Sequence, residues 1–232
     1  MKTRLSLAAL AVAALLALAL PALAETPSQL ARRVQKANQK INTLSASYLR
    51  LSRFVAVGPN AGRQVKATGR LLWSRPWNLR LEQDQPRQQL VVATAETVWW
   101  VRAARKRADV YPTSRFTSGL KPLMEALGGL ASLEDTFVVA KPTRQEAAAL
   151  ADTLTLALEP KIKRADLVRL VVWFDRRSLL PRGFRMVTLV GDVTDYRLRE
   201  VKVNQPLPAG AFSYKPPPDF KVRDHRGAPP AR

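Results

Sequence analysis

The sequence predicts a mainly β fold of the α+β class, an incomplete antiparallel β-barrel of about eleven strands with helical lid or plug segments. From Ser45 onward, apolar and polar residues alternate with the period of two that is typical of half-buried strands. Short turns join the alternating runs, which favours antiparallel pairing. A sheet of this length must close or curl to hide its edges, and the helical stretches between its strands can cover the apolar cavity that results.

Residues 1–24 have the pattern of a secretory signal peptide. Lys2 and Arg4 form a positive region, and an uncharged run follows as far as Leu20. The run ends at Pro21 and at the small-x-small sequence Ala22-Leu23-Ala24, which suits a signal peptidase. A retained membrane anchor is the alternative, but the run is shorter than the ~20 residues that a spanning helix needs. We therefore expect cleavage before residue 25 and release into the periplasm, as a chain that has no cysteine for lipidation or disulfides.

The exported chain opens with a predicted helix. Thr26 or Ser28 can cap it, and Pro27 suits its first turn. Its apolar residues recur at spacings of three and four, and basic residues lie away from that stripe. A basic amphipathic helix can bind a membrane surface, but we favour a helix packed on its own domain. The stripe consists of Leu30, Val34, Ala37, Ile41 and Leu44.

Eleven strands and two further helical stretches are expected along the rest of a single domain, residues 25–214. The helical stretches are residues 114–128 and 145–151, and a Pro-rich basic tail, residues 215–232, is expected to be extended or disordered. The expected strands are residues 46–57, 65–73, 78–84, 87–93, 97–102, 107–111, 135–140, 153–159, 166–175, 182–190 and 194–204.

The net charge restricts the partners. The whole chain carries +20, and loss of residues 1–24 removes two basic residues and no acidic ones, which leaves +18. Nucleic acid would be the usual partner of so basic a protein, but export argues against it. Contact with an anionic membrane surface, or with an acidic protein, remains open, and each basic residue near anionic lipid contributes ~1 kcal/mol. A well-solvated surface with no dedicated partner is the simpler alternative.

Catalytic groups are scarce. Without cysteine there is no thiolate nucleophile, and the single histidine, His225, lies in the Pro-rich tail, where no rigid shell is expected around it. Adjacent acids such as Glu134 and Asp135 are more simply explained as solvated residues at the start of a strand. No Gly-rich phosphate loop is present in the sequence. We therefore expect neither an enzyme nor a bound metal or cofactor.

Six segments, in this order and spacing, resemble the periplasmic outer-membrane lipoprotein carrier family (LolA-like proteins). None of these segments is specific alone. The chain also departs from the family at two places: it has Ala95-Glu96 where the family often has an Asp-Gly turn, and Thr188 where the family often has Asp. The resemblance extends over most of the exported chain. The segments are residues 69–76, with an Arg-Pro turn, 89–92, 97–100, 158–161, 191–196 and 212–217.

The resemblance implies an eleven-stranded incomplete barrel with an apolar cavity for lipoprotein acyl chains. It further implies collection of lipoproteins from an inner-membrane lipoprotein-releasing transporter and delivery to an outer-membrane lipoprotein receptor, by a carrier that we expect to be a monomer. A carrier or sensor of another lipid (glycolipid, phospholipid or polyketide) is the main alternative. A signalling protein that senses mislocalised lipid, or a polycation that coats envelope polymers, would be a different class.

Within this interpretation Arg75 is the expected gate. The Arg-Pro turn places its guanidinium at the end of a strand, where the free carbonyls at a lid-helix terminus would suit its five donors. An ordinary surface turn residue is the alternative. Trp99 and Trp100 cannot both face inward on one regular strand. Residues expected either to line the acyl-chain cavity or simply to form a packed core are Leu71, Trp73, Leu79, Leu81, Leu90, Val92, Trp99 and Trp100.

Overall fold

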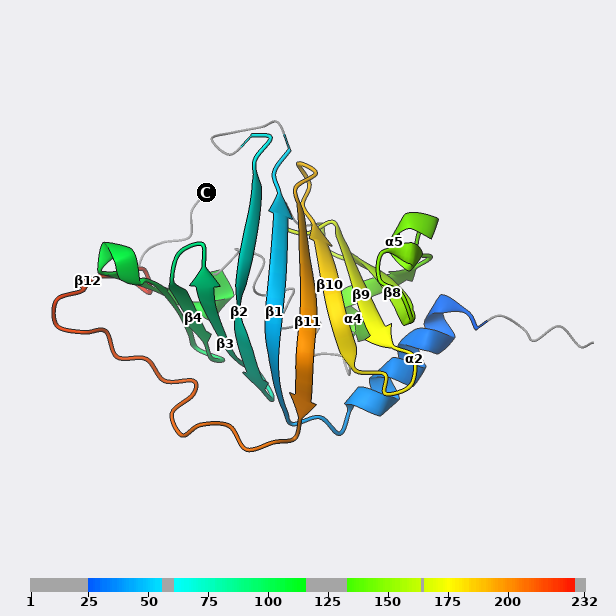
Figure 1. Ribbon diagram of the computed structural model, residues 1–232, viewed down its shortest axis with the longest axis horizontal. Helices are drawn as coiled ribbons and strands as arrows, with labels where there is room; N and C mark the ends of the chain where they lie inside the picture. The colour runs from blue at the N-terminus through cyan, green and yellow to red at the C-terminus, as the bar shows by residue number, and fades with distance from the viewer. Residues whose placement is uncertain (1–24, 56–60, 116–132, 164, 228–232) are drawn as a thin grey trace, which may run out of the picture.

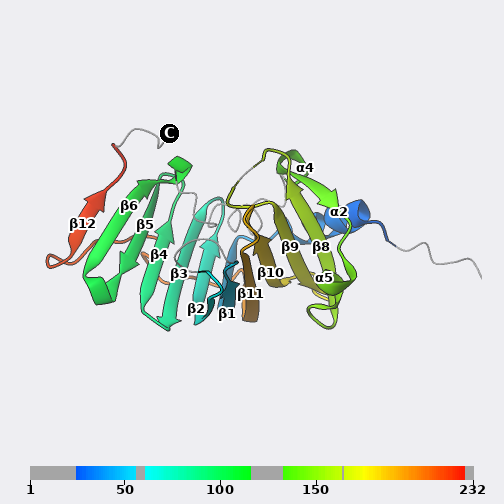
Figure 2. The same cartoon turned by 90° about the horizontal axis from the view of Figure 1, so that it is seen from above.

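The computed structural model describes residues 25–55, 61–115, 133–163 and 165–227. Its centre is one open, curved sheet of twelve strands, whose two ends rise to the same side (Figures 1 and 2). The strand order is β12-β6-β5-β4-β3-β2-β1-β11-β10-β9-β8-β7. Because every pair except β12–β6 is antiparallel, the predicted incomplete antiparallel barrel is confirmed.

The first eleven strands correspond one by one to the eleven predicted runs. Their bounds differ from the predicted ones by a few residues, as is usual at strand ends. The strands are β1 Thr43–Arg53, β2 Gln64–Ser74, β3 Asn78–Gln85, β4 Gln89–Ala93, β5 Thr97–Arg102, β6 Arg107–Pro112, β7 Phe137–Ala140, β8 Thr153–Pro160, β9 Arg169–Asp175, β10 Pro181–Val187 and β11 Val193–Val203.

Alternation along these strands gives the sheet two faces. We call the face that carries Leu71 and Trp73 the core face, and the opposite one the outer face. On β1, Ala46 pairs with Leu71 and Leu44 pairs with Trp73, so all four side chains lie on the core face. A single cluster of buried apolar residues continues from there across the core face to β8, β9, β10 and β11.

Helix α2 (Pro27–Asn38) packs into the core-face cluster. Thr26 forms the predicted N-cap in a capping box with Gln29. The helix buries Leu30 and Val34 as expected, but Ala37 is exposed. The register of the buried stripe is set instead by Ala31 and by Asn38, whose side-chain amide donates to the carbonyl oxygens of Val34 and Leu179.

Two other coverings lie on the outer face. Helix α5 (Arg144–Ala148) packs over β8 and β9, where the indole nitrogen of Trp173 donates to the carbonyl oxygen of Glu146 at 2.8 Å. The segment after β11 runs from the lower end of that strand toward β12 (Figure 1), and on its way Arg80 on β3 donates to the carbonyl oxygen of Ala211. Since both faces of the sheet are covered in places, many strands bury residues on both sides.

Short helical turns complete the described chain. They are η1 (Ala103–Arg105), η2 (Thr113–Arg115) and α4 (Leu133–Thr136), which leads directly into β7. The helical stretch predicted at 114–128 lies outside the described residues, apart from its first two positions. In the described part of the chain, no helix combines the length and apolarity needed to cross a membrane.

The tail contains a strand that the sequence analysis did not predict. Strand β12 (Lys221–Asp224) pairs in parallel with β6, and the backbone nitrogen of His225 donates to the carbonyl oxygen of Val110. The ring of His225 stacks on Tyr111 with 4.4 Å between centroids, and its Nε2 lies 3.3 Å from Asp109 Oδ1. The expectation that nothing would hold His225 is therefore wrong, because the pairing of β12 brings it against the sheet.

Candidate functional site

Four of the predicted cavity residues form one apolar block on the core face. Strands β2 and β3 pair so that Leu71 lies opposite Leu81 and Trp73 lies opposite Leu79. Leu71, Trp73 and Leu79 are buried, and Leu81 is partly buried at the edge of the same cluster. The side-chain nitrogen Nε1 of Trp73 is buried without a hydrogen-bond partner among the described residues, so this part of the face is strongly apolar.

The register of β4 and β5 divides the other four candidates between the two faces. Leu81 pairs with Val91, and Val91 pairs with Trp100, so Trp100 belongs to the core face. Leu90 and Val92 are the neighbours of Val91 along β4 and therefore point to the outer face. They cannot line the same cavity as Leu71.

Trp99 also lies on the outer face, because it pairs with Val92. The expectation that only one of the two adjacent tryptophans faces inward is confirmed. The prediction that Trp99 lines the cavity together with Leu71 is wrong, because Trp99 lies on the opposite face. Its ring packs against Tyr214, 5.4 Å away, in the segment that covers this part of the sheet. That covering buries Val92 as completely as a core residue, so burial alone does not identify the face.

The other half of the core face contains aromatic residues that the sequence analysis did not single out. Tyr196 on β11 stacks on Phe184 on β10, with 4.5 Å between ring centroids, and lies 5.5 Å from Tyr48 on β1. Burial is the main cause that raises the pKa of Tyr48 far above its ordinary value, so its hydroxyl stays protonated. The alternation of apolar and polar residues in β1 could have identified Tyr48 as a core-face residue. In β9, which is apolar at consecutive positions, the sequence pattern does not indicate which side chains face the core.

Arg75 joins the end of β2 to the C-terminal end of α2. Its Nε donates to the carbonyl oxygen of Ile41 at 2.6 Å, and its Nη2 donates to the carbonyl oxygen of Asn38 at 3.2 Å. Asn38 is the last residue of α2, where carbonyl groups have no partner within the helix and the helix dipole favours a cation. The guanidinium carbon lies 6.0 Å from the centre of the Trp73 ring. Arg75 thus ties the helix to the apolar block.

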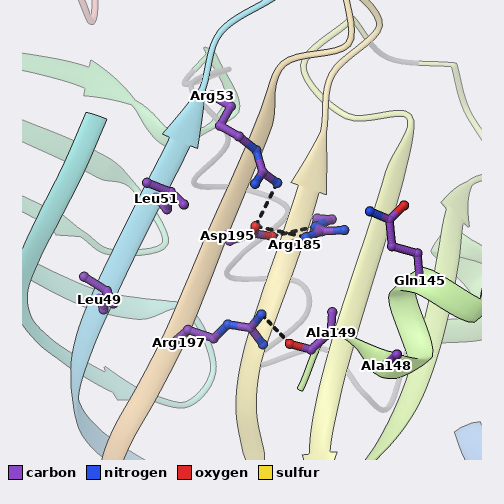
Figure 3. Close-up of a pocket in the computed structure, with 9 residues that line it drawn as sticks. All are labelled: Leu49, Leu51, Arg53, Gln145, Ala148, Ala149, Arg185, Asp195 and Arg197. Carbon is purple, nitrogen blue, oxygen red and sulfur yellow. Dashed lines mark hydrogen bonds and ion pairs between the residues drawn. The ribbon is translucent and has the colours of Figure 1, made fainter. Parts of the chain in front are cut away.

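A pocket of about 470 Å³ with charged and apolar side chains in its lining lies on the outer face between α5 and the strands β1, β10 and β11 (Figure 3). Asp195 accepts from Arg185 Nε at 2.6 Å and from Arg53 Nη2 at 3.1 Å. Arg197 has no acidic partner there: its Nη2 donates to the carbonyl oxygen of Ala149, and its Nη1 is buried without a partner in the described chain. Burial, opposed in part by Asp195, lowers the pKa of Arg197. The pocket therefore joins this cluster of charged groups to apolar side chains of β1 and α5.

Buried carboxylates are held in ion pairs. Asp109, fully buried, accepts from Arg102 and Arg107. Burial acts to raise its pKa, but hydrogen bonds from Arg107, His225 and Arg102 outweigh it and hold the pKa below the ordinary value. Such a carboxylate stays ionised and suits a structural ion pair better than proton transfer. Within the described ranges, no three His, Cys, Asp or Glu side chains come together as a metal site.

The family model and the curated relatives that match this chain carry the same description. A family model described as "Outer membrane lipoprotein carrier protein LolA" matches residues 39–215. An outer-membrane lipoprotein carrier protein of Azotobacter vinelandii is 27% identical over 198 residues, which cover 84% of this chain and 90% of that protein. The protein of the same name from Pseudomonas aeruginosa is 26% identical over 184 residues, covering 79% and 82%.

Among solved structures, an uncharacterized conserved protein from Thermus thermophilus is similar with a TM-score of 0.51. It is 13% identical, and the match covers 85% of this chain and 98% of that one. This likeness concerns the fold alone.

Proposed function

The chain belongs to the outer membrane lipoprotein carrier (LolA) family, and we propose that it binds the acyl chains of lipoproteins on its core face and ferries them across the periplasm. In this proposal it receives lipoproteins from an inner-membrane lipoprotein-releasing transporter and delivers them, as a monomer, to an outer-membrane receptor. No catalytic step is part of the proposal. The periplasmic form would begin at Glu25, which N-terminal sequencing of protein from a periplasmic fraction would show.

The observation that carries the proposal is the apolar core face. One cluster of buried side chains runs across it from Trp73 and Leu79 to Phe184 and Leu198. A helix, α2, is packed on this face, and Arg75 fixes the end of the helix by two hydrogen bonds. Acyl chains need an apolar surface that can be shielded from water, and a face covered by a separable helix offers one.

Energetics requires a cost that opposes binding. Two acyl chains of about fifteen methylenes each, at ~0.8 kcal/mol per buried methylene, would exceed the ~20 kcal/mol limit of known non-covalent affinities. A carrier with that affinity would not release its cargo. We propose that separating α2 from the sheet supplies the opposing cost, because it breaks the two bonds of Arg75, worth together about 2–4 kcal/mol.

The experiment that tests this function is displacement of an apolar fluorescent probe. The delipidated protein should bind the probe, and an acylated lipoprotein peptide should displace it, since both compete for the core face. The same peptide without acyl chains should leave the probe bound. Equal displacement by the two peptides would overturn the proposal and favour a polycation that binds peptides by charge.

A further inference from the structure

Exposed apolar side chains gather at one end of the sheet. Ile162 is 80% exposed, Leu189 69%, Val190 54% and Val55 44%. They come from three places in the chain: the connection between β8 and β9, the turn between β10 and β11, and the residues just after β1. We call these four residues the apolar tip.

Contacts between the three segments make the tip continuous. The backbone nitrogen of Leu189 donates to the carbonyl oxygen of Ala165 at 3.0 Å, which joins the β10–β11 turn to the β8–β9 connection. The backbone nitrogen of Val55 donates to Asp192 Oδ1 at 2.8 Å, which joins the end of β1 to the same turn. A pocket of about 440 Å³, with Lys163 and Leu189 in its lining, lies between the first two segments.

The apolar tip lies at the opposite end of the sheet from Arg75. Strand β1 begins beside Ser74, the neighbour of Arg75, and ends at Arg53, two residues before Val55. Its eleven residues correspond to roughly 35 Å of extended chain. Figure 1 shows the β10–β11 turn at the upper end and α2 at the lower right. A surface that contacts the tip therefore leaves the Arg75–α2 contact accessible.

The charge beside the tip is predominantly basic. Lys161 and Lys163 flank Ile162 and are exposed. The acids of these segments are not free: Glu159 is paired with Arg169, Asp192 accepts the backbone hydrogen bond of Val55, and Asp166 also has an interaction partner. The exposed lysines thus face solvent beside aliphatic side chains, in a chain whose net charge is strongly positive.

We propose that the apolar tip is a membrane-contact site for an anionic lipid surface, with the four aliphatic side chains among the head groups and Lys161 and Lys163 on lipid phosphates. Single aliphatic side chains on narrow turns fit between lipid head groups, whereas a protein interface needs a broader patch, about 800 Å² per partner. The excess of lysine matches the charge of anionic lipid. The contact goes beyond the proposed cargo function, and it would hold for an empty carrier.

Site-specific fluorescence gives the direct test. Because the chain has no cysteine, single cysteines can be introduced at Ile162 or Leu189 in residues 25–232 and labelled with an environment-sensitive dye. Trp77→Cys and Val222→Cys are the controls, since both side chains are exposed but lie away from the tip, Trp77 in the turn that follows Arg75 and Val222 on β12. The dye should shift to the blue at the tip positions with phosphatidylcholine–phosphatidylglycerol vesicles, and not at the control positions. Equal shifts at all four positions, or none at the tip, would overturn the proposal.

Vesicle flotation gives the affinity. Replacement of both Ile162 and Leu189 by serine should weaken vesicle binding by about tenfold or more, because two aliphatic side chains no longer insert. Lys161→Glu with Lys163→Glu should abolish the preference for phosphatidylglycerol, and the double serine variant of Trp77 and Val222 should bind like the wild type. Undiminished binding of the Ile162, Leu189 variant would refute the site. If the wild type did not bind vesicles but self-associated, and the Ile162, Leu189 variant did not self-associate, the tip would be a contact with a second copy of the chain instead.

Discussion

The guanidinium of Arg75 and the carbonyl oxygen of Ile41 are joined by a 2.6 Å hydrogen bond, which ties the end of β2 to the chain that leaves α2. A second bond reaches Asn38 in the last turn of the helix. Charged donors make the stronger hydrogen bonds of proteins, so loss of the Arg75 side chain would break two contacts that hold the end of the helix to the sheet. The first prediction concerns this connection.

Arg75→Leu should bind acyl cargo more tightly and release it more slowly. The variant no longer has the bonds that favour the closed, empty state, and it adds apolar surface beside Trp73. The loss of about 2–4 kcal/mol of opposing free energy corresponds to a slowing of about thirtyfold to several hundredfold. The measurement is the off-rate of an acylated peptide, with the free energy of unfolding determined in parallel.

Two further variants show whether the effect is specific. Arg75→Lys should be intermediate or closer to Leu, because an ammonium lacks the planar fork that reaches two carbonyls. Arg70→Leu changes an exposed arginine on the same strand and should release cargo at the wild-type rate. If Arg75→Leu also releases at the wild-type rate, the gate lies elsewhere.

Leu81 and Leu90 provide a test of which face binds the cargo. Both are partly buried, they lie on adjacent strands, and the register places Leu81 on the core face and Leu90 on the outer face. Leu81→Asn should weaken binding of an acylated peptide by about tenfold, because it removes an apolar side chain worth ~1.5 kcal/mol. Leu90→Asn should leave that affinity unchanged in a probe-displacement titration. Equal losses would contradict the core-face site.

The pair formed by buried Glu146 and half-buried Arg169 predicts a pH dependence of stability. Arg169 donates to both carboxylate oxygens of Glu146, at 2.6 and 2.9 Å, and this holds the pKa of Glu146 below its ordinary value of 4.5, although burial acts in the opposite direction. A lowered pKa in the folded state stabilises the fold above the unfolded value, and that contribution is lost as pH falls through the folded pKa.

Glu146→Gln should therefore lower the free energy of unfolding by about 3 kcal/mol near neutral pH, since it leaves the charge of Arg169 partly unpaired. The difference from wild type should shrink as the pH falls below about 4.5. Urea denaturation over a pH series measures both. Glu159→Gln removes the exposed partner of the same arginine and should cost less than about 1 kcal/mol. If the wild type and Glu146→Gln lost stability in parallel as the pH falls, the Glu146–Arg169 pair would not be the cause of the pH dependence.

Deletion of residues 221–232 should promote self-association. Strand β12 covers the edge of β6, and an uncovered strand edge presents unpaired backbone groups to other chains. Light scattering after size-exclusion chromatography should show dimers or larger species, whereas deletion of residues 228–232 alone should match the full chain. A monodisperse monomer after the longer deletion would show that β12 does not protect the edge.

The sequence predicted the strands better than the faces they present. Alternation located all eleven strands because one side of most of them carries polar residues, as in β2, where Lys66 and Arg70 alternate with Ala67 and Leu71. It failed at Leu90 and Val92 because the segment after β11 covers the outer face there, so both sides of β4 are apolar. The covering comes from more than a hundred residues away, and no local pattern records it.

Contacts between distant, polar segments were the other features that the sequence did not reveal. Strand β12 consists of Lys221, Val222, Arg223 and Asp224, which show no apolar alternation because the strand is held by its backbone. Arg75 was a prediction from one motif. Its two carbonyl partners follow from the position of α2, which depends on packing across the whole core face.

The most direct test of the account is native mass spectrometry of the protein isolated from the periplasm that produces it. The account predicts a complex of one carrier with one lipoprotein, whose mass falls to that of the empty protein when a detergent removes the acylated cargo. In the Arg75→Leu variant the loaded species should predominate. A carrier found only with phospholipid, glycolipid or polyketide, and never with an acylated protein, would contradict the proposed cargo.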